Sequence, residues 1–151
     1  MRTRSIKLEQ RVLMVALNHR DRRVRNNILA NTEVADFNGD EAVEIRRRID
    51  TLMKLGKKTG DIEAFAEDPS LSKGARAFIL MNPPTREKAR TVTRERVEAM
   101  LSTLQLYRRA RMLQQGMQRI LEGARGAISE ATMQAAENEM EFTLRAIRSS
   151  L

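Results

Sequence analysis

The sequence VEAMLSTLQLYRRARMLQQGMQRI, residues 97–120, is the most informative part of the chain for its fold class. Apolar residues recur in it every three or four positions and form two sets. They are Val97, Met100, Leu104 and Tyr107 in the first, and Leu106, Ala110, Leu113, Met117 and Ile120 in the second. A helix with two apolar faces contacts more than one neighbour. The stretch therefore predicts a long helix, from about Arg86 to Glu122, that packs on two sides.

The sequence that follows predicts the partner of this helix. Apolar residues recur there at intervals of three and four and form a heptad-like seam. They are Met133, Ala136, Met140, Leu144, Ile147 and Leu151. Gly123, Gly126 and Ser129 supply a turn and a cap between the two segments. We therefore expect an antiparallel helical hairpin.

Shorter helical patterns precede this hairpin. Leu8, Val12, Leu13 and Ala16 mark the first helix, and Asp21 is placed to cap a second. Three further patterns extend the series to about Leu80, and the strongest break in the chain follows at 82–85, Asn-Pro-Pro-Thr. The prediction is an all-α domain with a small globule of about five helices over 1–82 and the hairpin over 83–151.

Composition supports helices and excludes several kinds of site. Hydrophobic residues make up 41% and charged residues 32%, but aromatic residues only 3%, which suits amphipathic helices better than sheets. There is no cysteine and a single histidine, so we expect no disulfide, no metal site and no cofactor. No apolar run reaches the roughly 20 residues that span a bilayer, and the basic residues 1–10 lack the apolar stretch of a signal peptide. These features favour a cytoplasmic protein.

The net charge of +8 is concentrated in one segment. Residues 86–125 contain 10 basic and 4 acidic side chains. Such a stripe is suited to nucleic acid, to acidic lipid headgroups or to an acidic protein face, and a solvated helix face rich in arginine is an equally good interpretation. Its densest part is the best candidate for a functional surface, because arginines on one helix can grip phosphates or carboxylates. It consists of Arg108, Arg109 and Arg111, with Tyr107 and Arg119.

Three other patterns resemble sites without meeting their requirements. Residues 55–59, Leu-Gly-Lys-Lys-Thr, lack the earlier glycine of a phosphate-binding loop, since position 51 is Thr. His19 lies at the end of a helix, where a structural role is expected. The acidic residues around Phe37 crowd a helix N-terminus and do not follow the spacing of a calcium loop; they are Asp36, Asp40, Glu41 and Glu44.

Three short motifs resemble those of a known family. Residues 8–13, Leu-Glu-Gln-Arg-Val-Leu, are similar to the opening of the N-terminal domain of DnaB-type replicative helicases. Residues 34–37, Val-Ala-Asp-Phe, and 107–113, Tyr-Arg-Arg-Ala-Arg-Met-Leu, resemble later parts of that domain. Residues 15–19, Val-Ala-Leu-Asn-His, are closer to the homologous C-terminal helicase-binding domain of DnaG-type primases. The chain departs from the family between Glu63 and Ile79 and in its basic balance.

The resemblance implies a non-catalytic role in the replisome. In the helicases this domain pairs through its hairpin into a collar, which also docks primase, and in the primases the equivalent domain docks on that collar. The expected partners are a second copy of the chain and a DnaB-type helicase or DnaG-type primase. The hairpin would then expose Met112, Leu113 and Met117 within the arginine rim, although burial inside the hairpin is equally compatible with these residues. The chain would be a fragment of a longer helicase or primase, or a free-standing adaptor, and a start at Met1 slightly favours an N-terminal fragment or a complete small protein.

Two other classes of function remain as alternatives. One is a nucleic-acid-binding helical protein that uses the basic stripe, with Arg86, Lys88, Arg90 and Arg94 as candidate DNA contacts. The other is a helical enzyme with an arginine-lined pocket for a dicarboxylate, and only the number of arginines supports it.

Overall fold

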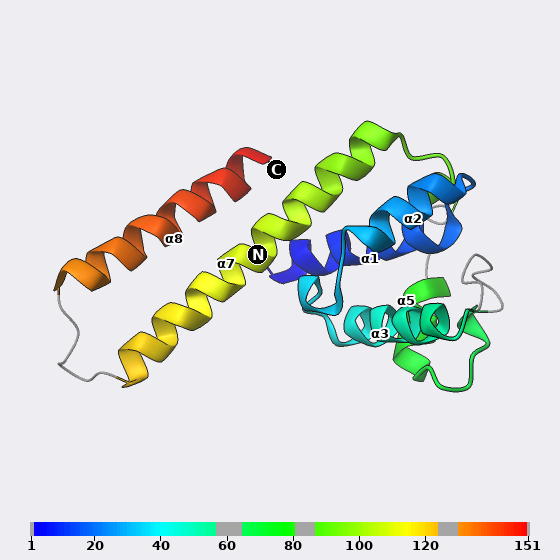
Figure 1. Cartoon of the computed structure of the whole chain (residues 1–151), viewed down its shortest axis with the longest axis horizontal. Helices are drawn as coiled ribbons and strands as arrows, with labels where there is room; N and C mark the ends of the chain where they lie inside the picture. The colour runs from blue at the N-terminus through cyan, green and yellow to red at the C-terminus, as the bar shows by residue number, and fades with distance from the viewer. Residues whose placement is uncertain (1, 57–64, 81–86, 124–129, 151) are drawn as a thin grey trace. The chain divides into compact units, whose positions relative to one another are not determined.

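The computed structural model of the chain describes residues 2–56, 65–80, 87–123 and 130–150. Every regular element in these ranges is helical, which confirms the predicted all-α class (Figure 1). Contacts divide the chain into two compact units, Met1–Leu104 (unit 1) and Gln105–Leu151 (unit 2). The boundary between the units falls inside a continuous helix. The Pro83-Pro84 joint expected from the sequence lies outside the described residues.

Helix α1 (Arg2–Asn18) is the central helix of unit 1 and contacts α2, α3 and α5. All six residues from Val12 to Leu17 are buried, at most 3% exposed. Sequence periodicity predicted a single apolar face containing Val12, Leu13 and Ala16, but Met14, Val15 and Leu17 are buried as well. A helix surrounded by neighbours is apolar on all sides, which weakens the periodicity that the prediction relied on.

Helix α2 (Arg22–Ala30) begins as predicted at an aspartate cap. The Asp21 carboxylate accepts a hydrogen bond from the backbone N–H of Arg23, at 2.8 Å, and so satisfies a donor at the helix start. The helix packs on α1 through Val24 and Ile28, both buried. A short 3₁₀ helix, η1 (Val34–Asp36), follows and contacts α3.

Helix α3 (Asp40–Lys54) buries an apolar stripe with helical spacing, Ala42, Ile45, Ile49 and Leu52. Its N-cap is Gly39, not Asp40, and the helix start is satisfied by a residue from another element. The carboxylate of Glu9 on α1, which is 0% exposed, accepts hydrogen bonds from the backbone N–H groups of Asn38 and Gly39. A buried anion at a helix N-terminus is stabilised by these donors and by the helix dipole.

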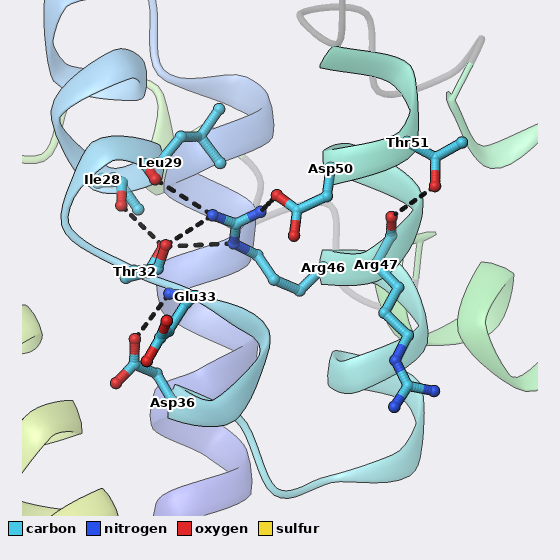
Figure 2. A network of polar contacts seen from close by, with 9 residues as sticks. All are labelled: Ile28, Leu29, Thr32, Glu33, Asp36, Arg46, Arg47, Asp50 and Thr51. Atoms are coloured by element: carbon cyan, nitrogen blue, oxygen red, sulfur yellow. Dashed lines mark hydrogen bonds and ion pairs between the residues drawn. The ribbon is translucent and has the colours of Figure 1, made fainter. Parts of the chain in front are cut away.

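A buried arginine joins α3 to the end of α2 (Figure 2). The side chain of Arg46 is 3% exposed and its guanidinium donates to the carbonyl oxygens of Leu29, at 3.1 Å, and Thr32, at 2.7 Å. It also donates to the Thr32 hydroxyl at 3.3 Å and to the carboxylate of Asp50. The guanidinium thus satisfies carbonyl groups that the helix end leaves without partners.

Helix α5 (Lys73–Leu80) is anchored to α3 through its cap. The Ser72 hydroxyl accepts from the N–H of Ala75 at 3.1 Å, while the Ser72 hydroxyl and N–H donate to the two carboxylate oxygens of Glu44, at 2.6 and 2.8 Å. Before it, Asp68 accepts from Arg48 at 2.6 Å and from Ser70.

Helix α7 (Arg94–Gly123) begins eight residues later than Arg86, the start predicted from the sequence. Residues 87–89 are helical, and the non-helical residues 90–93 separate them from α7. The Thr93 hydroxyl caps α7 by accepting a hydrogen bond from the N–H of Arg96, at 3.3 Å. In unit 1, α7 buries Val97, Leu101 and Leu104. Helix α8 (Glu130–Ser150) covers the predicted last helix, and most of the turn expected between α7 and α8 lies outside the described residues.

Candidate functional site

The arginine-rich segment of α7 places some of its predicted site residues on the surface and others beneath it. Arg109, Met112 and Arg119 are exposed, Met112 to 57%. Arg108, Arg111, Leu113 and Met117 are half-buried. The exposed group can therefore contact a partner directly, whereas the half-buried group offers only part of each side chain.

Tyr107 does not belong to this exposed group. It is 2% exposed, because it continues the apolar stripe of Val97 and Leu104 and turns inward with it. Its hydroxyl has no hydrogen-bond partner within the described part of the chain. Tyr107, the aromatic residue expected to make contacts beside the arginines, is therefore not accessible at the surface.

Charge is distributed unequally between the two helices of unit 2. The residues of α7 in unit 2 include four arginines and one glutamate, and α8 includes four glutamates and two arginines. One ion pair links the helices, from the Arg109 guanidinium to the Glu139 carboxylate at 3.3 Å. Both side chains are more than half exposed, so this pair adds little stability. The pair instead shows that the basic helix α7 and the acidic helix α8 carry complementary charges.

The second group of predicted contacts lies in unit 1, before and at the start of α7. Lys88, Arg90 and Arg94 are exposed, and Arg86 lies outside the described residues. The segment is tied to the turn between α1 and α2. The N–H of Arg20 donates to the carbonyl of Arg90 at 3.1 Å, and His19 bonds to the carbonyl of Val92 at 2.9 Å.

His19 has the structural role expected from its place at a helix end. It is 5% exposed, and its Nδ1 accepts from the backbone N–H of Asp21 at 3.0 Å. The neutral ring then carries its proton on Nε2, which donates to Val92. Both ring nitrogens are engaged with the backbone, so His19 is not arranged as a general base.

A pocket of about 500 Å³ opens beside this segment, entirely within unit 1. Three exposed cationic side chains line it: Arg11 from α1, Lys88 from the 87–89 turn and Arg96 from α7. Among the described residues that line it, none is acidic. Of these three side chains, Lys88 alone was predicted from the sequence as a contact residue. Arg11 and Arg96 are 85 residues apart in the chain, and no local pattern could bring them together.

The floor of the pocket is aliphatic and its wall includes two hydroxyl groups. Met14, Val15 and Ala89 are buried below it, and Val92 and Met100 are half-buried. Thr91 and Thr93 add exposed hydroxyls. The pocket therefore combines an apolar surface with a positive rim, an arrangement that fits a ligand with an apolar body and at least one negative group.

The structure describes only part of the other patterns considered from the sequence. Lys57, Lys58 and Thr59 of the glycine-lysine pattern lie outside the described residues. Glu44 is occupied with Ser72. Among the residues the structure describes, no group of three or more His, Cys, Asp or Glu side chains could hold a metal ion, and no helix is both long and apolar enough to cross a membrane.

Comparison with known proteins finds no relatives for the chain. No protein-family model matches it. No curated protein matches it. No solved structure matches it.

Proposed function

We propose that the chain is a non-catalytic protein-interaction domain of the replication machinery, in which α7 and α8 form an antiparallel hairpin that pairs with the hairpin of a second copy. The resemblance of residues 8–13, 34–37 and 107–113 to the helicase and primase domains motivates the replisome context. In that context the paired hairpins dock a DnaB-type helicase or a DnaG-type primase in the cytoplasm.

One observation carries the self-association: apolar side chains of unit 2 that the chain does not cover. On α7 the second stripe is buried at Ala110, at 3%, but its extension Leu121 is 51% exposed. On α8, Phe142 is 69% exposed, on the side of the helix away from the predicted seam residues Met133 and Met140. Among the described residues Phe142 is the most exposed large apolar side chain, and we expect an interface between two copies to cover it.

Charge complementarity supports a second copy as the occupant. In a two-fold dimer with α7 of one copy against α8 of the other, a basic helix meets an acidic helix twice, because a two-fold interface repeats each contact. The pair Arg109–Glu139 already shows the match within one chain. Arg119 on α7 and Glu137 on α8 are exposed, and they can form the same match across the interface.

The test is the solution mass by light scattering over a hundredfold range of concentration. We expect the wild-type chain to dimerise and Phe142→Ser to remain monomeric at concentrations where the wild type associates. Leu55→Ser is the matched control, because Leu55 is an equally exposed leucine, 63%, in unit 1, and its variant should dimerise like the wild type. A wild-type chain that is monomeric throughout would contradict the proposal.

The replisome assignment has its own measurement. Mixing the chain with a DnaB-type helicase or a DnaG-type primase from the same source should give a complex of higher mass, weakened by Arg109→Glu or Phe142→Ser. A chain that dimerises but leaves both proteins unbound would keep the self-association and refute the replisome context.

A further inference from the structure

We propose that the pocket of unit 1 binds single-stranded nucleic acid, with one base on its aliphatic floor and the adjoining phosphates on Arg11, Lys88 and Arg96. This site is separate from the surface of unit 2 and goes beyond the proposed function. Its failure would leave the self-association untouched, and the converse also holds.

The charges of the pocket indicate a phosphate ligand. Arg11, Lys88 and Arg96 are exposed, and within the described part of the chain none of them forms an ion pair. Cationic side chains without carboxylate partners keep their full attraction for an incoming anion, and arginine can bind a phosphate through two N–H groups.

Further cations beyond the pocket favour a strand over a single small anion. The backbones of Arg20 and Arg90 are joined at 3.1 Å, both side chains are exposed, and Lys88 lies only two residues from Arg90. A lone carboxylate or phosphate would occupy only the rim of the pocket. A polyanion with one charge per nucleotide would use these additional cations as well.

The floor of the pocket favours a strand with unpaired bases. Val92 and Met100, which are half-buried, present aliphatic surface in the pocket, and the bases of a duplex cannot pack on it because they are stacked and paired inside. A volume of about 500 Å³ lies within the range of small-molecule sites and is large enough for a nucleotide unit. The lining residues that the structure describes include no aromatic side chain, so the base packs on aliphatic groups and we expect little preference among bases.

The hydrogen bonds around the pocket hold its parts in place before a ligand arrives. His19 fixes the carbonyl of Val92, and the Thr93 hydroxyl fixes the first turn of α7, which carries Arg96. Arg11 belongs to the buried central helix of unit 1. Because the cations are carried by fixed backbone, less entropy is lost when a strand binds.

The experiment is fluorescence anisotropy with the full chain and a labelled oligothymidylate of about 16 nucleotides. The double variant Arg11→Gln/Arg96→Gln should bind about tenfold more weakly or worse. The slope of log K against log salt should become shallower by about 1.4, because each phosphate of a single strand that the protein no longer neutralises reduces the slope by about 0.7. Arg47→Gln is the matched control, because Arg47 is an exposed arginine on α3 outside the pocket, and its variant should bind within twofold of the wild type. Equal losses of affinity in the control and the double variant would overturn the site.

Four competitors test the identity of the ligand. An abasic strand of equal length should compete clearly less well than oligothymidylate, and equal competition would overturn the placement of a base in the pocket. Tighter binding of the matching duplex would overturn the preference for single strands. Thymidine monophosphate should compete only at much higher concentration, and an affinity equal to that of the strand would assign the pocket to a free nucleotide. Stronger displacement by an acidic peptide than by the strand would assign it to a protein partner and refute the proposal.

Discussion

Replacing Arg46 with methionine should be among the most destabilising single changes in unit 1. Methionine keeps the aliphatic stem but removes every hydrogen bond that the guanidinium donates (Figure 2). The carbonyls of Leu29 and Thr32 would then remain inside the protein without this donor. A buried acceptor that loses a charged donor costs about 1.5–3 kcal/mol, and breaking a buried ionic contact costs about 3–5 kcal/mol in all.

We therefore expect a loss of about 3 kcal/mol in the free energy of unfolding. The bond to Asp50 adds little to this figure, because the Asp50 side chain is 39% exposed. Urea denaturation followed by circular dichroism measures the effect. With a denaturant slope of about 1.5 kcal/mol per molar, the midpoint should fall by about 2 M.

Two variants on the same helix serve as controls for Arg46→Met. Asp50→Asn and Arg47→Gln should each cost less than about 1 kcal/mol, because their side chains lie at the surface. A midpoint shift of Arg46→Met no larger than that of Arg47→Gln would refute the reasoning. It would mean that the carbonyls at the end of α2 find other donors when the guanidinium is gone.

Three further changes test other parts of the structure. Burial raises the pKa of Asp68, but hydrogen bonds from Ser70 and contact with Arg48 outweigh it and lower the pKa from 3.8 to about 2. The ionised carboxylate therefore contributes about 1–2 kcal/mol of stability above pH 3.8, which is lost as the pH falls through about 2, and the difference in urea midpoint between the wild type and Asp68→Asn should shrink over that range. Glu9→Gln should cost about 1–3 kcal/mol in a thermal or urea melt, because a neutral amide replaces the buried carboxylate at the start of α3. Gly116→Ala should gain about 0.5–1 kcal/mol in the melting of unit 2, since Gly116 lies inside α7 and nothing stands within 4 Å of the added methyl.

Each of these expectations has an outcome that contradicts it. A difference between the wild type and Asp68→Asn that stays constant from neutral pH to pH 2 would show that the charge contributes nothing. A neutral Glu9→Gln would show that the carboxylate is not needed at the cap, and Glu41→Gln, at a half-buried position in the first turn of α3, is its control. A Gly116→Ala variant that melts lower than the wild type would indicate a neighbour on that face of α7, as a second copy would supply.

The positions of the helices could be predicted because their signals are local. The apolar stripe of α3 recurs every three or four residues, Asp21 directly precedes α2, and Gly56, with a φ of 69°, follows the end of α3. Each of these signals lies within a few residues of the element it describes. The start of α7 was misplaced because the turn at 87–89 is itself helical and leads almost directly into it.

The polar interior and the pocket could not be predicted, because their partners are distant in the chain. Glu9 meets Gly39, 30 residues away, and Arg46 meets Leu29, 17 residues away. In the sequence both look like ordinary charged residues on helix surfaces. For the same reason the sequence did not show that Arg11 and Arg96 line one pocket. Tyr107 was predicted as a contact residue, but its side chain is buried.

Helix α1 and the residue that follows it form hydrogen bonds with residues far along the chain, which affects the order of folding during synthesis. Gln10 donates to the carbonyl of Phe78, 68 residues later, and His19 to that of Val92, 73 residues later. At about 5–20 residues per second, the ribosome needs about 4–15 s to make the segment that completes α1. During this interval the six apolar residues Val12–Leu17 lack part of their cover and are open to chaperones or to other nascent chains. The contacts of α1 are thus completed only after most of the remaining part of unit 1 has been synthesised.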